Sequence, residues 1–300
     1  MNLDKAPIII FAFNRPLSLK SLIRSLLTNP EIVESHLYVF IDGPRSEEEK
    51  CAVNEVYNFT SSITGFKSIT ISLGNKNKGL GPSVIEGVTE VINKHGKAII
   101  LEDDLILQPN FLKFMNEGLA CFENIKDVFS ICGYSNKIKI PVGYEYDSYF
   151  CTRSSSWGWG TWRDRWDTVK WNFENLNEYN HLKKQFNRWG GSDCFGMLQD
   201  CISGKNKSWA IRFCFAQFLQ EKVSLFPTKS LVINDGFDGN GSNCKKWSRF
   251  KYELMSQEKI SFRFPKRLKI DKQIYLSAMR YHSFLSRVKS RFMYIITNLK

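Results

Sequence analysis

The 300-residue sequence has no long hydrophobic run, although 43% of its residues are hydrophobic. A helix that spans a bilayer needs roughly 18 or more apolar residues in succession, and no such stretch occurs. The apolar segment from Pro7 to Phe13 is short, and no small-residue cleavage pattern follows it. We therefore expect this segment to be a β-strand rather than a secretory signal, in a protein of the cytoplasm.

The sequence also lacks the usual spacing motifs of metal and nucleotide sites. Its eight cysteines form no CxxC pair, and its four histidines are scattered without ligand spacing. The P-loop and GxGxxG patterns are absent, as are GxSxG, HExxH and the EF-hand loop. These absences argue against a structural zinc site, a P-loop nucleotidase and a serine hydrolase. We expect the cysteines to be buried thiols in a reducing compartment.

Acidic residues are scarce only near the C-terminal end. The chain contains 42 Lys and Arg against 30 Asp and Glu, a net charge of +12. Residues 261–300 hold ten of the basic residues and one acid, which leaves residues 1–260 with a net charge of +3. A nucleic-acid-binding protein carries its basic residues across the binding face of the fold. We therefore expect no nucleic-acid partner, and residues 263–300 form a basic tail.

Short apolar runs alternate with longer helical patterns over the first 134 residues. The expected strands are residues 8–13, 37–41, 69–73, 98–101 and 128–132, and the expected helices are residues 17–27, 47–61, 82–94 and 110–122. Wholly apolar strands that alternate with helices are typical of a parallel sheet with helices on both faces. We therefore predict an α/β fold with a mostly parallel central sheet.

Residues 135–262 have a different composition, rich in turn residues and tryptophan. They include the run Trp157 to Trp162, a helical segment at 208–221 and the glycine-rich stretch 234–241. We expect them to form a smaller second half on the same sheet, beside a first half of residues 1–134.

Residues 271–298 predict a single amphipathic, cationic helix within the basic tail. Such a helix favours attachment to an anionic membrane surface. A helix packed on the body of the protein or on a second subunit is an equally good interpretation.

Three adjacent carboxylates, Glu102, Asp103 and Asp104, follow the apolar strand at residues 98–101. Ligands of open α/β sheets bind at the carboxyl ends of the strands. Adjacent acids repel one another unless a cation joins them, and Mg²⁺ and Mn²⁺ are commonly held by one or two carboxylates plus substrate phosphates. The cluster therefore predicts a metal–diphosphate site. The alternative is a solvated acidic loop in which one acid caps the next helix.

Other polar residues follow neighbouring strands. Asp42 could accept hydrogen bonds from a base or ribose, or could simply begin the turn at Gly43-Pro44. Arg15 could bind a phosphate with two hydrogen bonds, or be a solvated turn residue. The stretch from Asn75 to Gly81 offers basic groups and glycines before a helix, as phosphate sites require.

Tryptophans at 157, 159 and 162 are separated by glycine and threonine. Aromatic faces pair with the apolar faces of sugar rings, so Trp157 and Trp159 are candidate substrate residues. Packing in the core is an equally good interpretation.

Taken together, these segments resemble nucleotide-sugar-dependent glycosyltransferases of the GT-A fold, a Rossmann-like α/β fold. The chain is similar to bacterial sugar transferases related to N-acetylglucosaminyltransferase I. The resemblance covers roughly residues 7–244, and it rests on the following segments: Phe11 to Pro16, Asp42, Asn77 to Gly81, Leu101 to Leu105, Ser130 to Tyr134, Trp157 to Trp162, Ser208 to Arg212 and Asn234 to Gly241.

The resemblance implies specific roles around a nucleotide-sugar donor, expected to be UDP-linked, and a Mn²⁺ or Mg²⁺ cofactor. It implies Asp104 as a metal ligand, Asp103 near the ribose and Glu102 facing the donor sugar. It further implies Arg15 at the diphosphate, Asp42 at the uracil, Asn77 and Lys78 beside the donor, and Arg212 with Trp157 and Trp159 on the substrate side.

An inverting transferase also needs a general base for the acceptor hydroxyl. In the eukaryotic relative an Asp follows a tryptophan, but here Trp209-Ala210-Ile211-Arg212 contains no carboxylate. We take Asp238 as the candidate base, with Asp235 and Asp200 next, although Asp-Gly is also an ordinary turn pair. Ser242-Asn243 departs from the Thr-His expected in close bacterial relatives.

The sequence thus favours an enzyme that transfers a hexose or N-acetylhexosamine to a glycan or glycolipid acceptor, as in lipopolysaccharide or capsule synthesis. Its placement would be cytoplasmic, and peripheral on the inner face of the membrane. A nucleotidyltransferase shares the sheet, the metal and the diphosphate chemistry. A noncatalytic carbohydrate-binding protein is the third interpretation, because the base after Trp209 is missing.

Overall fold

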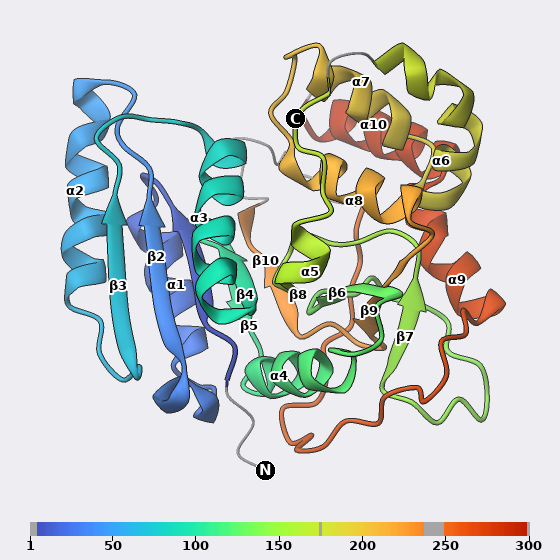
Figure 1. Cartoon of the computed structure of the whole chain (residues 1–300), viewed down its shortest axis with the longest axis horizontal. Helices are drawn as coiled ribbons and strands as arrows, with labels where there is room; N and C mark the ends of the chain where they lie inside the picture. Colours follow the sequence, from blue (N-terminus) through green and yellow to red (C-terminus); the bar gives the residue numbers. More distant parts are fainter. Residues whose placement is uncertain (1–4, 174–175, 237–248, 299–300) are drawn as a thin grey trace.

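The computed structural model describes residues 5–173, 176–236 and 249–298. Within them, eight strands form one sheet in the order β3-β2-β1-β4-β8-β6-β9-β7. The strands are β1 (Ile8–Ala12), β2 (His36–Ile41), β3 (Ser68–Leu73), β4 (Lys97–Glu102), β6 (Val128–Cys132), β7 (Ser148–Cys151), β8 (Trp159–Trp162) and β9 (Val223–Pro227). Helices flank this sheet (Figure 1). The predicted α/β fold with a mostly parallel central sheet is confirmed.

The first four strands of the sheet are parallel, and alternate residues of β1 enter different cores. Ile8 and Ile10 pack with α1 (Pro16–Leu26) and α2 (Glu47–Ser61). Ile9 and Phe11 pack with α3 (Leu80–His95) on the opposite face. Because both faces are covered, every residue of β1 is apolar and buried. The expected helices and strands of this region agree with the structure to within about two residues, a normal uncertainty for element ends.

The remaining strands extend the same sheet beyond β4. β8 pairs antiparallel with both β4 and β6, β9 runs parallel to β6, and β7 closes the edge antiparallel to β9. The helices of this side include α4 (Phe111–Cys121), α5 (Arg163–Trp166), α6 (Lys183–Gly190), α7 (Cys194–Ile202) and α8 (Trp209–Leu219), with a 3₁₀ helix at Leu176–Leu182. Another 3₁₀ segment, Pro30–Glu34, precedes β2.

A small second sheet lies beside the acidic cluster. β5 (Leu105–Leu107) begins directly after Asp104 and pairs antiparallel with β10 (Val232–Asn234), with Asn234 opposite Leu105. This pairing brings the start of the glycine-rich segment to the carboxyl end of β4, although the two segments are distant in the sequence.

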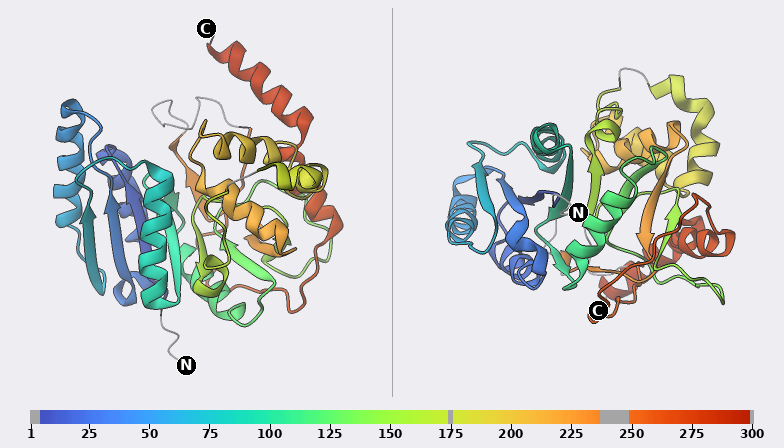
Figure 2. Two further views of the ribbon diagram at one scale, coloured as in Figure 1. Left: turned by 45° about the horizontal axis from the view of Figure 1, so that its top comes forward. Right: turned by 60° about the horizontal axis from the view of Figure 1, so that its bottom comes forward.

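The single helix expected at residues 271–298 is wrong. The structure has α9 (Lys272–Met279), a 3₁₀ turn at Arg280–His282, and α10 (Phe284–Asn298). Ser283 separates them with extended backbone angles, and its hydroxyl accepts the N–H of Ser286. α9 buries Ile274 and Ala278 against β7 and β9. α10 projects from the body, as the left view of Figure 2 shows.

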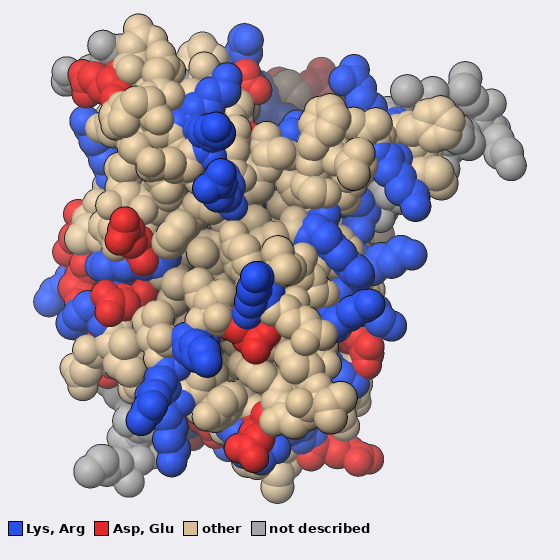
Figure 3. Space-filling view, turned by 90° about the vertical axis from the view of Figure 1, so that its right-hand side faces the viewer, with Lys and Arg blue, Asp and Glu red and all other residues tan. Residues whose placement is uncertain are grey.

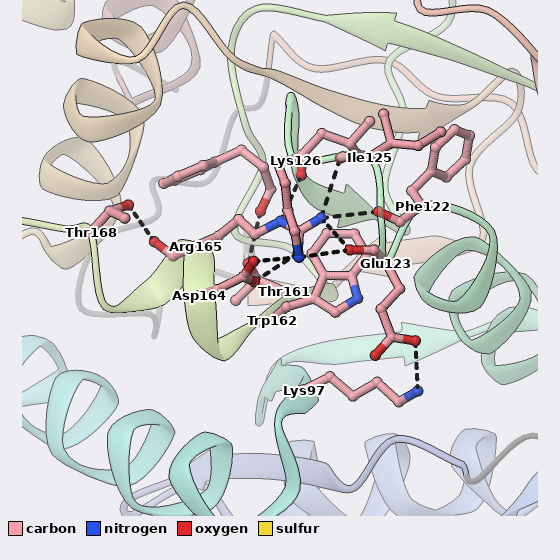
Figure 4. Close-up of polar contacts among 12 residues, drawn as sticks. Lys97, Phe122, Glu123, Ile125, Lys126, Thr161, Trp162, Asp164, Arg165 and Thr168 are labelled. Carbon is pink, nitrogen blue, oxygen red and sulfur yellow. Dashed lines mark hydrogen bonds and ion pairs between the residues drawn. The ribbon is translucent and has the colours of Figure 1, made fainter.

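Arg165, on α5, joins this helix to the segment from Phe122 to Val128 (Figure 4). Its guanidinium donates to the carbonyls of Phe122, Glu123, Ile125 and Val128 and to the carboxylate of Asp164, at 2.7–3.3 Å. The guanidinium carbon lies 4.1 Å from the centre of the Trp162 ring. The side chain is 1% exposed, so its hydrogen bonds replace those lost to water.

Two other expectations meet the structure here. Cys51 and Cys121 are exposed on helix surfaces, so the prediction of buried thiols is wrong for them, whereas Cys132, Cys151, Cys194 and Cys214 are buried. No helix within the described ranges combines the length and apolar character that crossing a membrane requires.

Candidate functional site

A cavity of about 800 Å³ is lined by residues from both the first and the second half of the chain. Its walls come from the carboxyl ends of β1, β2 and β4, the loops before α3 and α8, the segment after β7, and the C-terminal residues around Met279. Ligand sites of small-molecule enzymes commonly have this size. Eight of the candidate site residues line it, namely Arg15, Asp42, Asn77, Glu102, Asp103, Asp104, Trp157 and Trp159.

The three carboxylates are held at the end of β4, whose last residue is Glu102. Burial, followed by the charges of Asp104 and Asp103, raises the pKa of Glu102 to about 8. Burial, followed by the charge of Asp104, raises the pKa of Asp103 to about 7, although Arg15 opposes this effect. The cluster is therefore a concentration of buried negative charge that a cation would relieve.

Asp104 has the clearest opening for a cation. Its Oδ2 accepts a hydrogen bond from Arg15 Nη1 at 3.5 Å, while its Oδ1 is buried and has no hydrogen-bond partner within the part of the chain that is described. Burial raises the pKa of Asp104 more than Arg15 lowers it. A buried carboxylate oxygen without a partner fits Mg²⁺ or Mn²⁺, which prefer oxygen ligands. Among the described residues, no group of at least three His, Cys, Asp or Glu side chains converges on a metal position.

Residues Asn234 to Gly236 pass directly over this carboxylate. The Asp235 N–H donates to the Asp104 carbonyl at 2.9 Å, and the Gly236 N–H donates to Asn234 Oδ1 at 2.9 Å. A Cβ atom at position 236 would lie 2.2 Å from Asp104 Oδ2 and 3.0 Å from Asn234 Oδ1. A side chain larger than glycine would force the Asp104 carboxylate or the segment to move. Asn234, which belongs to the glycine-rich stretch but has no predicted role, thus becomes a site residue. The feature of the sequence that could have indicated this role is Gly236, two residues after Asn234.

Asp42 lines the cavity, and its carboxylate also binds the neighbouring backbone. Its carboxylate accepts the N–H groups of Gly43, Lys78 and Gly79 at 2.8–3.0 Å. Asn77 Nδ2 donates to the Gly43 carbonyl at 2.9 Å. These bonds fix the loop before α3 against the end of β2, so that Asp42 shapes the cavity wall that it lines.

Lys78 and Arg212 have partners elsewhere and are absent from the described residues that line the cavity. The ammonium group of Lys78 pairs with Glu86 on α3. The guanidinium of Arg212 donates to the carbonyls of Ser208 and Trp171. In the structure both side chains therefore support neighbouring loops.

The two candidate tryptophans differ. Trp159 lies on β8, is 1% exposed and stacks on Trp209 with ring centres 4.9 Å apart, which is core packing. Its indole Nε1 is nevertheless buried without an acceptor among the described residues. Trp157 is half-buried at the cavity, edge-on to Tyr134 at 4.5 Å. Trp157 is thus the aromatic residue better placed to meet a ligand.

The candidate bases are placed unequally. Asp238 lies outside the described residues, as do Ser242 and Asn243. Asp235 is close enough to raise the pKa of Asp104. Asp200 is exposed on α7 and pairs with Lys205 at 3.7 Å, and it does not line the cavity.

Comparisons with known proteins find distant likenesses in structure. No family model and no curated protein matches the sequence. The structure of residues 1–349 of Staphylococcus aureus TarS aligns with a TM-score of 0.40 at 12% identity, over 76% of this chain and 59% of TarS. The mannosyltransferase PcManGT from Pyrobaculum calidifontis, in complex with GDP-Man and Mn²⁺, aligns with a TM-score of 0.36 at 10% identity, over 55% of this chain and 48% of that one.

A third structure, UDP-glucose pyrophosphorylase complexed with UDP-glucose, aligns with a TM-score of 0.40 at 10% identity, over 75% of this chain and 91% of that one. The chain therefore spans about three fifths of the TarS fragment and about half of the mannosyltransferase. Because all these likenesses are distant, function has to be inferred from the residues of the site.

Proposed function

We propose that this protein is a metal-dependent glycosyltransferase that moves a hexose or N-acetylhexosamine from a nucleotide-sugar donor, UDP-linked, to a cell-surface glycan or lipid-linked acceptor. The observation that carries the proposal is the carboxylate cluster at the end of β4. Buried acids face a cavity of about 800 Å³, one Asp104 oxygen has no described partner, and Arg15 stands beside it. This donor set suits a divalent cation and a diphosphate together.

The proposed donor site follows from this arrangement. Arg15 binds the diphosphate, Asp103 approaches the ribose and Glu102 faces the donor sugar. Asp42, Asn77 and the backbone that they fix form the wall next to the nucleotide base, and Lys78 acts through the loop rather than by direct contact. In this proposal residues 1–134 hold the donor and residues 135–262 hold the acceptor.

Asp104 and Asn234 are the residues that would hold Mn²⁺ or Mg²⁺. When bound, the cation supplies charge neutralisation for the departing nucleoside diphosphate. The chain itself contributes the rigid end of β4 and the close passage of Gly236, which together keep the Asp104 carboxylate facing the cavity.

For an inverting reaction, a carboxylate must take the proton of the acceptor hydroxyl. Asp238 remains the proposed base, with Asp235 as the alternative because it precedes the same glycine-rich segment. Trp157 is proposed to pack against a sugar ring, and Arg212 to maintain the α8 side of the acceptor half.

Thermal stabilisation by nucleoside diphosphates tests the donor class, because a ligand that binds only the folded state raises the melting temperature. We expect UDP with Mn²⁺ to stabilise the protein, and UDP alone to do so much less. Asp104→Asn should abolish the Mn²⁺-dependent part. If no nucleotide stabilises the wild type, a noncatalytic carbohydrate-binding protein becomes the better interpretation.

The products of the reaction separate a glycosyltransferase from a nucleotidyltransferase. Incubation with a UDP-sugar and an acceptor extract should release UDP. Release of pyrophosphate from UTP and a sugar phosphate would instead identify a nucleotidyltransferase.

A peripheral membrane position is proposed from α10. Its exposed apolar residues are Phe284, Leu285, Val288 and Phe292, and basic residues stand between them. On the side of the molecule drawn in Figure 3, more Lys and Arg than Asp and Glu are visible. An amphipathic helix of this composition binds anionic lipid surfaces.

Vesicle sedimentation tests the membrane proposal. Leu285→Gln combined with Phe292→Gln should reduce sedimentation with phosphatidylglycerol vesicles. Leu17→Gln on α1, which is 75% exposed, is the matched control and should have no effect. Equal sedimentation of all three proteins would remove the membrane role.

A further inference from the structure

A second charged group, unrelated in sequence to the acidic cluster, lines the same cavity. It consists of Arg153 after β7, Asp193 before α7, Arg249, and His282 in the turn before α10. Arg153 Nη1 donates to Asp193 Oδ1 at 2.9 Å and to the Gly190 carbonyl at 2.7 Å. Arg249 Nη2 lies 3.8 Å from Asp193 Oδ2. Segments distant in the chain thus meet around one carboxylate.

Positive charge is in excess in this group. A third guanidinium, that of Arg287, lies 4.0 Å from Asp193 Oδ2. The carboxylate of Asp193 is ionised, because Arg153 and Arg287 lower its pKa although burial raises it. Within the described residues, three arginines therefore share one negative charge, and the side chains of Arg153 and Arg249 are only 17% and 21% exposed. A largely buried excess of positive charge is costly unless an anion compensates it.

The guanidinium groups also retain hydrogen-bonding capacity. The hydrogen bonds of Arg153 within the described part of the chain all use Nη1. Arg249 donates through Nε to the Tyr281 carbonyl at 2.9 Å and stacks on Phe250, with its guanidinium carbon 4.4 Å from the ring centre. The remaining N–H groups form the planar fork that suits carboxylates and phosphates.

His282 adds a polar atom without a partner. Its Nδ1 is buried and has no hydrogen-bond partner among the described residues. Burial, followed by the charges of Arg153 and Arg249, holds the pKa of His282 well below 6.5, so the ring is neutral at physiological pH. A neutral ring can donate one hydrogen bond to a ligand without adding to the positive charge.

A purely structural role does not account for these features. The backbone already joins the start of α7 to the turn at 280–282, because Ser192 N donates to the His282 carbonyl at 3.1 Å. Arg165 shows how this chain satisfies an arginine that serves structure alone, with carbonyls around it and no place in the cavity wall. The second charged group instead faces the cavity.

We propose that Arg153, Arg249 and His282 bind an anionic group of the acceptor, a phosphate or a carboxylate carried by its sugar or its lipid linker. This inference rests on the proposed function, since it assigns the acceptor to the half of the cavity walled by α7, α8 and the C-terminal residues. In the proposed donor site the diphosphate would bind Arg15 and the cation that Asp104 would hold, and both residues come from the other half of the sheet.

Calorimetric titration of the full chain with glucose 6-phosphate, glucuronate and glucose tests the proposal. We expect at least one of the two anionic sugars to bind about tenfold more tightly than glucose, the difference that a charge-assisted hydrogen bond supplies. The stronger of the two identifies the source of the anion, phosphate or carboxylate. Equal binding of all three sugars would overturn the proposal.

Variants of Arg249 locate the binding. Arg249→Gln should weaken the anionic sugar by about tenfold, and Arg249→Lys should weaken it less, since lysine keeps the charge but not the planar fork. Arg188→Gln, an exposed arginine on α6, is the matched control and should leave the affinity unchanged. The melting temperature of each variant without ligand verifies that it is folded, and an unchanged affinity in folded Arg249→Gln would contradict the proposal.

Titration with UDP and Mn²⁺ separates this inference from the proposed function. Arg249→Gln should keep the wild-type UDP affinity, whereas Asp104→Asn should lose it and keep the anionic sugar. If Arg249→Gln loses UDP affinity instead, the group belongs to the donor site and the proposal is overturned. If no nucleotide binds the wild type but the anionic sugar binds through Arg249, the subsite stands and the glycosyltransferase proposal fails.

Discussion

Arg165 and Arg153 are both largely buried, but their guanidinium groups have different surroundings. Arg165 donates to four carbonyls and one carboxylate and is 1% exposed. Arg153 shares Asp193 with two other arginines and faces the cavity. Like Arg153, the carboxylates at the end of β4 are charged groups at the cavity wall whose internal partners are incomplete, because Asp104 Oδ1 is buried without a described partner.

The difference separates two uses of buried charge. A charge with a full set of internal partners stabilises the fold and leaves nothing for a ligand. A charge held at a cavity wall with incomplete compensation destabilises the empty protein and gains its partner on binding. Removing a charge of the first kind should therefore reduce stability without changing ligand binding. Removing a charge of the second kind should weaken ligand binding without reducing stability.

Replacement of Arg165 should have the largest effect on stability. Arg165→Met leaves four carbonyls, two of them in buried hydrogen bonds, with fewer donors and should lower the free energy of unfolding by about 3 kcal/mol. Urea denaturation measures the change. Arg163→Met on the same helix is the matched control, because the Arg163 side chain is exposed and, among its described contacts, donates only to the Asn93 carbonyl. A loss of UDP affinity in folded Arg165→Met would break the comparison.

Gly236→Ala should change both ligand binding at the site and the stability of the fold. The added Cβ would lie 2.2 Å from Asp104 Oδ2, so the carboxylate or the segment must move. We expect a destabilisation of about 1 kcal/mol, and about tenfold weaker binding of UDP with Mn²⁺. Gly196→Ala, whose added Cβ meets nothing within 4 Å, is the control: it should leave UDP binding unchanged and, because it lies within α7, should stabilise the fold by up to about 1 kcal/mol. Identical UDP titrations for all three proteins would show that the close passage has no role in binding.

The dependence of stability on pH tests the positive surroundings of His282. Its pKa in the folded protein lies well below 6.5, because of burial and of the charges of Arg153 and Arg249. The unfolded chain therefore binds a proton that the folded protein does not, and stability falls as the pH falls through 6.5.

Between about pH 7.5 and about pH 5.5, the wild type should lose about 1 kcal/mol more than His282→Gln, which has no ring to protonate. Urea denaturation at the two pH values measures the difference. Parallel losses in the two proteins would mean that His282 titrates normally and that the surrounding charge is compensated.

Asp104→Asn should have the smallest effect on stability and, if any, an increase. Burial raises the pKa of this carboxyl despite Arg15, so its negative charge lowers the stability of the protein when no cation is bound. In EDTA we expect a change of less than about 1 kcal/mol, since the lost contact with Arg15 offsets part of the relief. A large destabilisation would mean that Asp104, like Arg165, is a charge that stabilises the fold.

The first half of the fold follows from local sequence. The apolar residues of β1 must be buried on both faces, and the pattern of α2 predicts Glu47 to Ser61 without error. The acidic cluster was also predictable, because a carboxylate at the end of a buried strand is placed by the strand itself. The break of the C-terminal helix at Ser283 was not, since a continuous amphipathic pattern runs across it and the break depends on contacts made by the turn at 280–282.

The sequence by itself therefore determined the alternation of strands and helices, and with it the edge of the sheet where Glu102, Asp103 and Asp104 stand. The tertiary structure decided which polar side chains retain capacity for a ligand. The Asp42 carboxylate accepts hydrogen bonds from three backbone N–H groups, whereas Arg153, Asp193, Arg249 and His282 meet at one cavity. Strand burial is a local property of the pattern, but compensation of charge depends on which distant segments come together, and only the folded chain brings them together.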